Sequence, residues 1–218
     1  MYEALLKATQ EYQKIAASFA KPGPAALFGL PPAGRALLYA ALQKDLGRVL
    51  CIVTPGEAEA THFADDLKAL GLAAAVFPPR DFMLRPVEGA GREYEYRRLS
   101  VLGALAGGRL QAVCVPAEAL LQYTVPRDEF LKNTLTLKPG MVYNREVLFG
   151  STEETAGALR AAVKKARGKH RTALEKATEA DLSQLDSGLM PEAMDKYYGI
   201  RYPEPATLLD HLDAPLFI

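Results

Sequence analysis

Cysteine is scarce in this chain of 218 residues, and its two cysteines, Cys51 and Cys114, belong to no recognisable motif. Each lies inside an apolar run, VLCIV or AVCVP, which is typical of a small buried side chain in a strand. No CxxC pair or Cys/His pair has the spacing of metal ligands, and no disulfide framework is present. We therefore expect no metal or other cofactor, and a reducing, cytoplasmic environment.

The chain also lacks an excess of either charge and any long apolar segment. Its 26 Lys and Arg residues balance 26 Asp and Glu residues, which argues against tight nucleic-acid binding through overall charge. A local basic patch remains possible. The first twenty residues, MYEALLKATQEYQKIAASFA, are amphipathic and carry charges throughout. They resemble neither a signal peptide nor a transmembrane helix, so no membrane association is expected.

Apolar residues are nevertheless abundant, at 49% of the chain, which is enough for a packed core. Short apolar runs that end in turn signals alternate with stretches of helical periodicity, as in parallel α/β sheets. We expect strands at 25–29, 49–55, 73–79 and 110–116, and helices at 3–19, 34–46, 57–70 and 93–105. This order predicts a three-layer α/β domain over residues 1–135, with a mostly parallel sheet and helices on both faces.

The remainder of the chain changes character. Residues 136–150 form a short junction with strand-like alternation around a Pro-Gly turn, and residues 151–218 form a third part that is mainly helical. Its final residues, APLFI, resemble a buried strand that returns to the sheet, so we expect the chain to be a piece of a longer protein. Five cations lie close together in this part: Lys164, Lys165, Arg167, Lys169 and Arg171. Such a run usually marks a solvated helix face, and a nucleic-acid contact is the alternative.

One segment has the spacing of a phosphate-binding loop. The residues Gly29-Leu30-Pro31-Pro32-Ala33-Gly34-Arg35-Ala36 follow a predicted strand and precede a predicted helix, as in the G-x-x-x-x-G-K-[ST] motif. Gly29, Gly34, Arg35 and Ala36 are thus the candidate residues of a vestigial phosphate loop. The alternative is an ordinary strand–turn–helix that happens to contain two glycines.

The residues that would act on a nucleotide are missing from this loop. Arg35 replaces the lysine that reaches the phosphates, and Ala36 replaces the hydroxyl that coordinates Mg²⁺. Pro31 and Pro32 remove two backbone N–H donors. No predicted strand ends in the aspartate that would hold the metal. The segment therefore predicts a degenerate, P-loop-like nucleotide fold that is retained as a scaffold and is not an ATPase by itself.

Several longer blocks resemble the N-terminal region of the bacterial transcription-repair coupling factors, which is similar to the excision-repair subunit UvrB. The blocks are VLCIVTPGEAEATHFADDL, FPPRDFMLRPVEGAGREYEYRRLSVLGAL, AVCVPAEALLQ with TLTLKPG, and GLMPEAMDKYYGIRYPEPATLLDHL. They extend from near residue 25 to the end, and the most specific lies at Gly188–Asp210. The resemblance implies a non-catalytic scaffold of a nucleotide excision repair factor, an ATP-dependent DNA translocase that acts on stalled RNA polymerase. The partners it implies are the other domains of that factor and, through them, RNA polymerase and DNA.

One departure from the family concerns the module that recruits UvrA. In the family this UvrB-like module follows the TLTLKPG strand, but here only KPGMVYN and REVLFGS, which resemble its two ends, lie between Lys138 and Ser151. The resemblance therefore implies that this chain has lost UvrA binding through that surface. The sequence leaves open whether the deletion is natural or engineered.

The residues alone offer two further functions. Arg92, Tyr96, Arg97 and Arg98 lie in a segment that mixes basic and aromatic residues, as single-stranded DNA binders do. The same segment also fits a helix whose leucines at 99, 102 and 105 face the sheet, and this structural interpretation is favoured. An unrelated enzyme is disfavoured because the three histidines are scattered and the paired carboxylates fall on predicted exposed helix faces. A DNA- or protein-binding α/β module unrelated to repair remains the alternative function.

Overall fold

The computed structural model describes residues 2–21, 23–24, 26–80, 93–132, 134, 152–189, 191, 197–202, 204 and 206–218. The chain forms two compact units, one of residues 1–122 with 211–218 and the other of residues 123–210. Residues 123–135 thus belong to the second unit, whereas the sequence analysis placed them in the α/β domain. The predicted junction at 136–150 lies outside the described residues.

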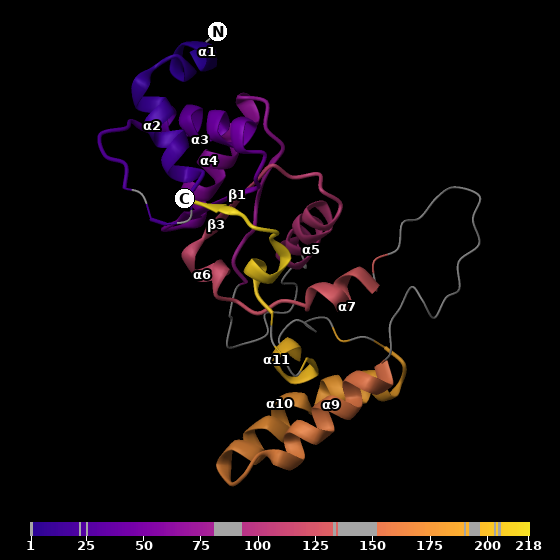
Figure 1. The fold of residues 1–218 in the computed structure, drawn as a ribbon. Coiled ribbons are helices and arrows are strands. Elements are labelled where there is room, and N and C mark those ends of the chain that lie inside the picture. The colour runs from indigo at the N-terminus through magenta and orange to yellow at the C-terminus, as the bar shows by residue number, and fades with distance from the viewer. Residues whose placement is uncertain are drawn as a thin grey trace, which may run out of the picture. The chain divides into compact units, whose positions relative to one another are not determined.

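The first unit is built on a four-stranded parallel sheet (Figure 1). Its strands are β1 (Leu50–Thr54), β2 (Ala74–Val76), β3 (Ala112–Pro116) and β4 (Leu216–Phe217), in the spatial order β2-β3-β1-β4. Leu50 pairs with Ala112 on one side and with Leu216 on the other. β3 is buried along its whole length, as expected of a strand covered on both faces. The α/β class and the returning terminal strand are confirmed.

Two short helices precede the sheet where the sequence predicted one. α1 (Tyr2–Lys7) and α2 (Gln10–Phe19) are separated because Thr9 caps α2, its side-chain oxygen accepting a hydrogen bond from Tyr12 N at 3.2 Å. The hydroxyl of Tyr12 donates to Asp45 Oδ2 at 2.6 Å, and Lys7 Nζ forms an ion pair with Asp45 Oδ1 at 2.5 Å. These contacts fix α1 and α2 against the helix that carries Asp45.

Helices cover both faces of the sheet. α3 (Pro32–Leu46) begins at a proline and ends before Gly47, whose φ of +65° places it in the left-handed region favoured at helix ends. α4 (Glu57–Ala69) packs on the strands through Ala60, Ala64 and Leu67, and α5 (Glu93–Ala106) lies across the sheet from it (Figure 1). A short helix, α6 (Ala117–Leu120), follows β3 directly. A parallel sheet with flanking helices agrees with the predicted α/β class.

One predicted strand does not form. Residues 26–29 lie outside any strand, although Leu27 packs against the core beside α3. Phe28 is 91% exposed, and Gly29 has a φ of +80°, which ends the extended backbone. An isolated apolar run needs a hydrogen-bonded neighbour to become a strand, and β1 already pairs with β3 and β4.

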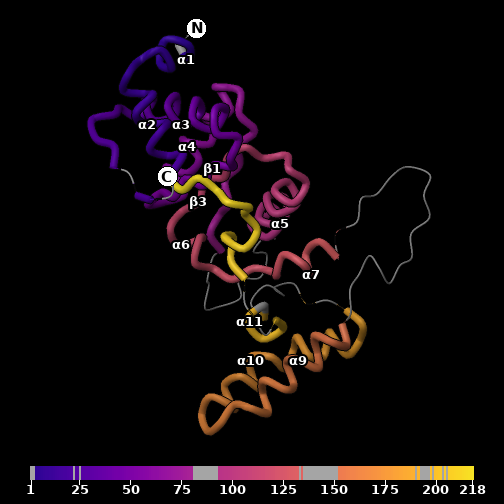
Figure 2. Tube along the Cα trace, in the orientation of Figure 1, coloured from indigo at the N-terminus to yellow at the C-terminus, as the bar shows by residue number. Residues whose placement is uncertain are grey.

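The second unit is helical (Figure 2). It contains α7 (Arg127–Lys132), α9 (Thr152–Lys165), α10 (Lys169–Asp186) and α11 (Tyr198–Arg201), and the 3₁₀ helix η2 (Leu208–His211) leads back to the first unit. The part predicted as mainly helical, at 151–218, contains α9 and α10 as an antiparallel pair, because Gly168 separates them with a φ of +56°. Its small core consists of Ala156, Leu159, Leu185 and Tyr197. No helix among the described residues is long and apolar enough to cross a membrane.

Candidate functional site

The candidate phosphate loop lies at the start of α3. Gly34, Arg35 and Ala36 fall in the first turns of that helix, and no described strand precedes them. A side chain at Gly34 would place its Cβ 3.2 Å from Cδ of Pro31, so tight packing explains this glycine. The left-handed backbone explains Gly29. The strand–loop–helix context on which the motif depends is therefore only half present.

The side chains that replace the catalytic residues are used for packing. Ala36 is buried, with 1% of its surface exposed. Arg35 is partly buried, and its guanidinium lies 5.7 Å from the ring centroid of Phe63 in α4. Phe63 in turn stacks on Tyr39 of α3. These contacts pack α3 against α4, with the Arg35 side chain near Phe63 of α4.

In parallel α/β sheets, ligands usually bind at the carboxyl ends of the strands, where the chain order reverses. Here that point lies between the adjacent strands β1 and β3. The hydroxyl of Thr54, at the end of β1, donates to the carbonyl oxygen of Gly56 at 2.8 Å. The next helix, α4, starts with the acidic residues Glu57 and Glu59. Their negative charge opposes an anion at the end of the helix where phosphate would otherwise bind.

The candidate contact residues of α5 separate into two groups, and Arg92 lies outside the described residues. Tyr96 is 60% exposed. Arg97 is partly exposed, lies 5.8 Å from the ring centroid of Tyr94 and approaches Glu57 to 3.6 Å. Arg98, in contrast, is buried with 4% of its surface exposed. The prediction of Arg98 as a surface contact is therefore wrong.

Arg98 holds the end of β2 in place. Its Nη1 donates to the carbonyl oxygen of Pro78 at 2.8 Å and to Gln122 Oε1 at 3.1 Å, and its guanidinium lies 4.0 Å from the ring centroid of Phe77. Gln122 Oε1 also accepts from the backbone N–H of Arg80 at 2.7 Å. The signal for this role was present in the sequence, because Arg98 lies one helical turn before Leu102 on the apolar face of α5.

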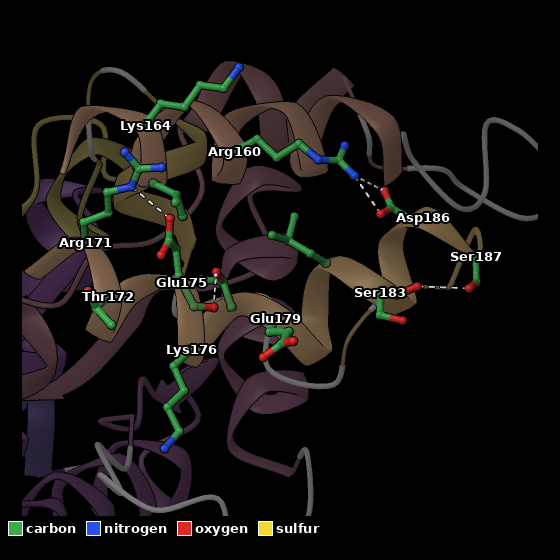
Figure 3. Close-up of a pocket in the computed structure, with 13 residues that line it drawn as sticks. Arg160, Lys164, Arg171, Thr172, Glu175, Lys176, Glu179, Ser183, Asp186 and Ser187 are labelled. Carbon is green, nitrogen blue, oxygen red and sulfur yellow. Dashed lines mark hydrogen bonds and ion pairs between the residues drawn. The ribbon is translucent and has the colours of Figure 1, made fainter. Parts of the chain in front are cut away.

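The helical unit contains an open groove along α9 and α10, with a volume of about 920 Å³ (Figure 3). Its charged residues are largely paired with each other. Arg160 donates to both carboxylate oxygens of Asp186, at 2.5 and 2.6 Å, and Arg171 donates to Glu175 at 2.9 Å. Lys164 extends away from these carboxylates (Figure 3). These pairs neutralise Arg160 and Arg171, so little net charge remains in the groove to select a ligand.

Neither the thiols nor the carboxylates form a reactive centre in the part of the chain that the structure describes. Burial raises the pKa of both Cys51 and Cys114 to about 12, so neither is a nucleophile at neutral pH. No group of three His, Cys, Asp or Glu side chains among the described residues could hold a metal ion. The prediction that both cysteines are buried is confirmed.

Comparison of the chain with models of known protein families and with curated proteins finds no match. The resemblance to the repair factors thus depends on the residues of this chain, above all on the block at Gly188–Asp210.

Proposed function

We propose that this chain is a non-catalytic α/β scaffold from the N-terminal region of a transcription-repair coupling factor. The repair assignment is supported by the four sequence blocks. The non-catalytic assignment is supported by one observation, which is that the carboxyl edge of the sheet carries Glu57 and Glu59 where a nucleotide-binding domain presents phosphate-binding groups. In this role the chain would pack against other domains of the factor and restrain its motor.

The buried Arg98 adds support from an independent direction. Arg98 lies in one of the blocks that resemble the family, and it contacts Phe77 and Pro78 at the start of the same block. Arg98, a basic residue within a Tyr- and Arg-rich helix, therefore serves the fold. Such a use of charge is expected of a scaffold, whose requirement is a fixed shape.

The proposal is tested by adding the chain in trans to a repair factor that lacks its own N-terminal region. We expect the ATPase rate of the truncated factor to fall, in a manner that saturates with the concentration of the chain. An ATPase rate that stays constant at high concentrations of folded chain would refute the restraining role.

The non-catalytic part is tested separately by thermal unfolding with and without ATP and Mg²⁺. A ligand that binds the folded state raises the melting temperature by mass action. We expect the same melting temperature in both solutions, and a rise that increases with ATP concentration would contradict this part of the proposal.

The proposal also includes the loss of UvrA binding, which can be tested by itself. Titration of UvrA with this chain should give no binding isotherm, whereas an intact N-terminal region measured in parallel should bind. Equal affinities for the two proteins would show that the surface had survived.

The alternative function, a single-stranded DNA or protein-binding module unrelated to repair, is favoured by the exposed Tyr94 and Tyr96 beside Arg97. Bases stack on exposed aromatic side chains in such modules. Tyr96→Ala should then weaken single-strand binding by about 1–3 kcal/mol. Equal affinities of Tyr96→Ala and the unsubstituted chain would exclude stacking on this side chain.

A further inference from the structure

The turn between α9 and α10 carries a concentrated positive charge. Residues 164–171, Lys-Lys-Ala-Arg-Gly-Lys-His-Arg, include five Lys and Arg residues and no acid, although the whole chain has no net charge. We call these eight residues the basic tip. All five of its Lys and Arg side chains are exposed.

Most of this charge is not neutralised within the described structure. Arg171 pairs with Glu175 at 2.9 Å. The other four Lys and Arg side chains of the basic tip form no ion pair with any residue that the structure describes. Away from the tip, Asp186 of the same hairpin is paired with Arg160. The basic tip therefore presents four uncompensated cations to solvent.

The local arrangement is also unfavourable for the isolated hairpin. Lys164 and Lys165 lie at the C-terminus of α9, where cations are stabilising. Lys169 and Arg171, however, lie in the first turn of α10, which contains no acid and receives no side-chain cap from Gly168. Cations at this end of a helix are repelled by its dipole. An external anion would remove this unfavourable interaction, which makes the basic tip a better ligand-binding surface than an ordinary solvated face.

The composition of the basic tip selects among anionic partners. It contains no Phe, Tyr, Trp or large aliphatic side chain, whereas protein interfaces are enriched in such aromatic residues and depleted in lysine, and membrane-surface helices insert apolar residues. Its only ring is the imidazole of His170, and a single strand carries fewer phosphate charges per unit of length than a duplex, so a cluster of cations favours the duplex. It also lacks Ser, Thr, Asn and Gln side chains that could recognise the 2′-hydroxyl of RNA. What remains is attraction to the phosphate backbone of duplex DNA.

We propose that the basic tip of the α9–α10 hairpin binds the phosphate backbone of duplex DNA without reading its sequence. Contacts of this kind release counterions, so the logarithm of the affinity falls with the logarithm of the salt concentration by about 0.9 for each phosphate engaged. Each lysine that contacts a phosphate thus adds about 0.9 to this slope. The contact is independent of the proposed restraint of a motor.

The test measures fluorescence anisotropy of a labelled duplex DNA of arbitrary sequence, titrated with the full chain over a range of salt concentrations. The test variant is Lys165→Gln/Lys169→Gln. The control variant, Lys14→Gln/Lys21→Gln, removes the same charge from exposed positions in the first unit. All substituted side chains are exposed, so circular dichroism should show three folded proteins.

We expect the test variant to lower the salt slope by about 1.8, and to weaken binding roughly tenfold for each lysine at about 0.1 M salt. The control variant should behave as the unsubstituted chain. Equal losses in the two variants would attribute binding to overall charge and would overturn the proposal, as would unchanged binding in the test variant or no duplex binding by the unsubstituted chain.

Titrations with three further ligands distinguish duplex DNA from the other anionic partners. Single-stranded DNA of equal length, duplex RNA and phosphatidylserine vesicles are each titrated with the unsubstituted chain. Weaker binding to all three than to duplex DNA is the expected result. Tighter binding to any one of them would identify that ligand as the partner and refute the choice of duplex DNA.

Discussion

Arg98 offers the sharpest test of how this structure uses its basic residues. The sequence placed it among four candidates for nucleic-acid contact, but the structure buries it between α5 and the end of β2. The two roles predict opposite results for Arg98→Ala. A structural role lowers stability, and a contact role lowers DNA binding while leaving stability unchanged.

The magnitude follows from the contacts that are lost. Arg98 donates two hydrogen bonds, to Pro78 O and Gln122 Oε1, and hydrogen bonds from charged donors contribute about 1.5–3 kcal/mol each. A desolvated cation over an aromatic ring such as Phe77 adds about 2 kcal/mol. These values are not additive, so we expect a total loss below their sum, of about 3–5 kcal/mol. We therefore expect Arg98→Ala to lower the free energy of unfolding of the first unit by this last range.

The two buried thiols make an assay that reports on the first unit alone. Cys51 in β1 and Cys114 in β3 are fully buried, so they react with a thiol reagent only when the sheet opens. In urea, a slope of about 2 kcal/mol per M converts the expected loss into a midpoint shift of roughly 1.5–2.5 M. Arg97→Ala is the matched control, because this neighbouring arginine is partly exposed and its ion pair with Glu57 lies at the surface, so the midpoint should change by no more than about 0.5 M.

Arg98→Lys separates charge from geometry. Lysine keeps the charge but cannot reproduce the planar fork, so it should recover less than half of the loss. Unchanged midpoints for Arg98→Ala and Arg98→Lys, together with weaker DNA binding, would refute the structural role and restore the contact hypothesis.

Three further predictions concern the first unit. Tyr12→Phe removes the hydrogen bond to Asp45 and should lower the free energy of unfolding by about 1–2 kcal/mol in urea titrations, whereas an unchanged value would mean that this bond does not fix α2. Hydrogen bonds from Lys7 and Tyr12 lower the pKa of Asp45, so their stabilisation should be complete above pH 4 or so and lost as pH falls through the lowered pKa, as measured by acid titration of the helical circular dichroism signal. Burial raises the pKa of Cys51 and Cys114 to about 12, so the folded state keeps protons that the unfolded state loses above about pH 8.5. Between about pH 8.5 and pH 12, each thiol should therefore lower the free energy of unfolding by up to about 1.4 kcal/mol for every unit of pH. Replacing both cysteines with alanine should make the free energy of unfolding less dependent on pH in this alkaline range.

The strands and most helices of the first unit could be predicted because their sequence signals are local and agree with one another. Continuous apolar runs at 49–55 and 110–116 contain β1 and β3, and the terminal APLFI contains β4. Each run is short, ends at a turn signal and alternates with an amphipathic helix. Burial of the thiols follows from the same runs. These features needed no knowledge of which strands are neighbours.

The sequence is a poor guide to the burial of a residue whose contacts lie far away in the chain. The burial of Arg98 depends on Gln122 and on the carbonyl oxygen of Pro78, which lie about twenty residues away on either side. Period alone placed Arg98 on the apolar face, but its charge favoured an exposed position, and only the tertiary contacts resolve that conflict. The basic tip is the reverse case, because the sequence indicates its cations, but only the folded hairpin shows that four of the five form no ion pair with a residue that the structure describes.

The segment at 29–36 shows why spacing alone does not establish a phosphate loop. In a working loop, the preceding strand fixes the direction from which the backbone N–H groups approach the phosphates, and the glycines allow that approach. Here the preceding residues are not a strand, Gly34 accommodates Pro31, and Arg35 turns toward Phe63. Each feature of the motif thus has a packing cause that requires no nucleotide. Lysine and threonine at positions 35 and 36 would supply the functional groups of the motif without the strand that aims them, so we expect these two substitutions alone to confer no nucleotide binding.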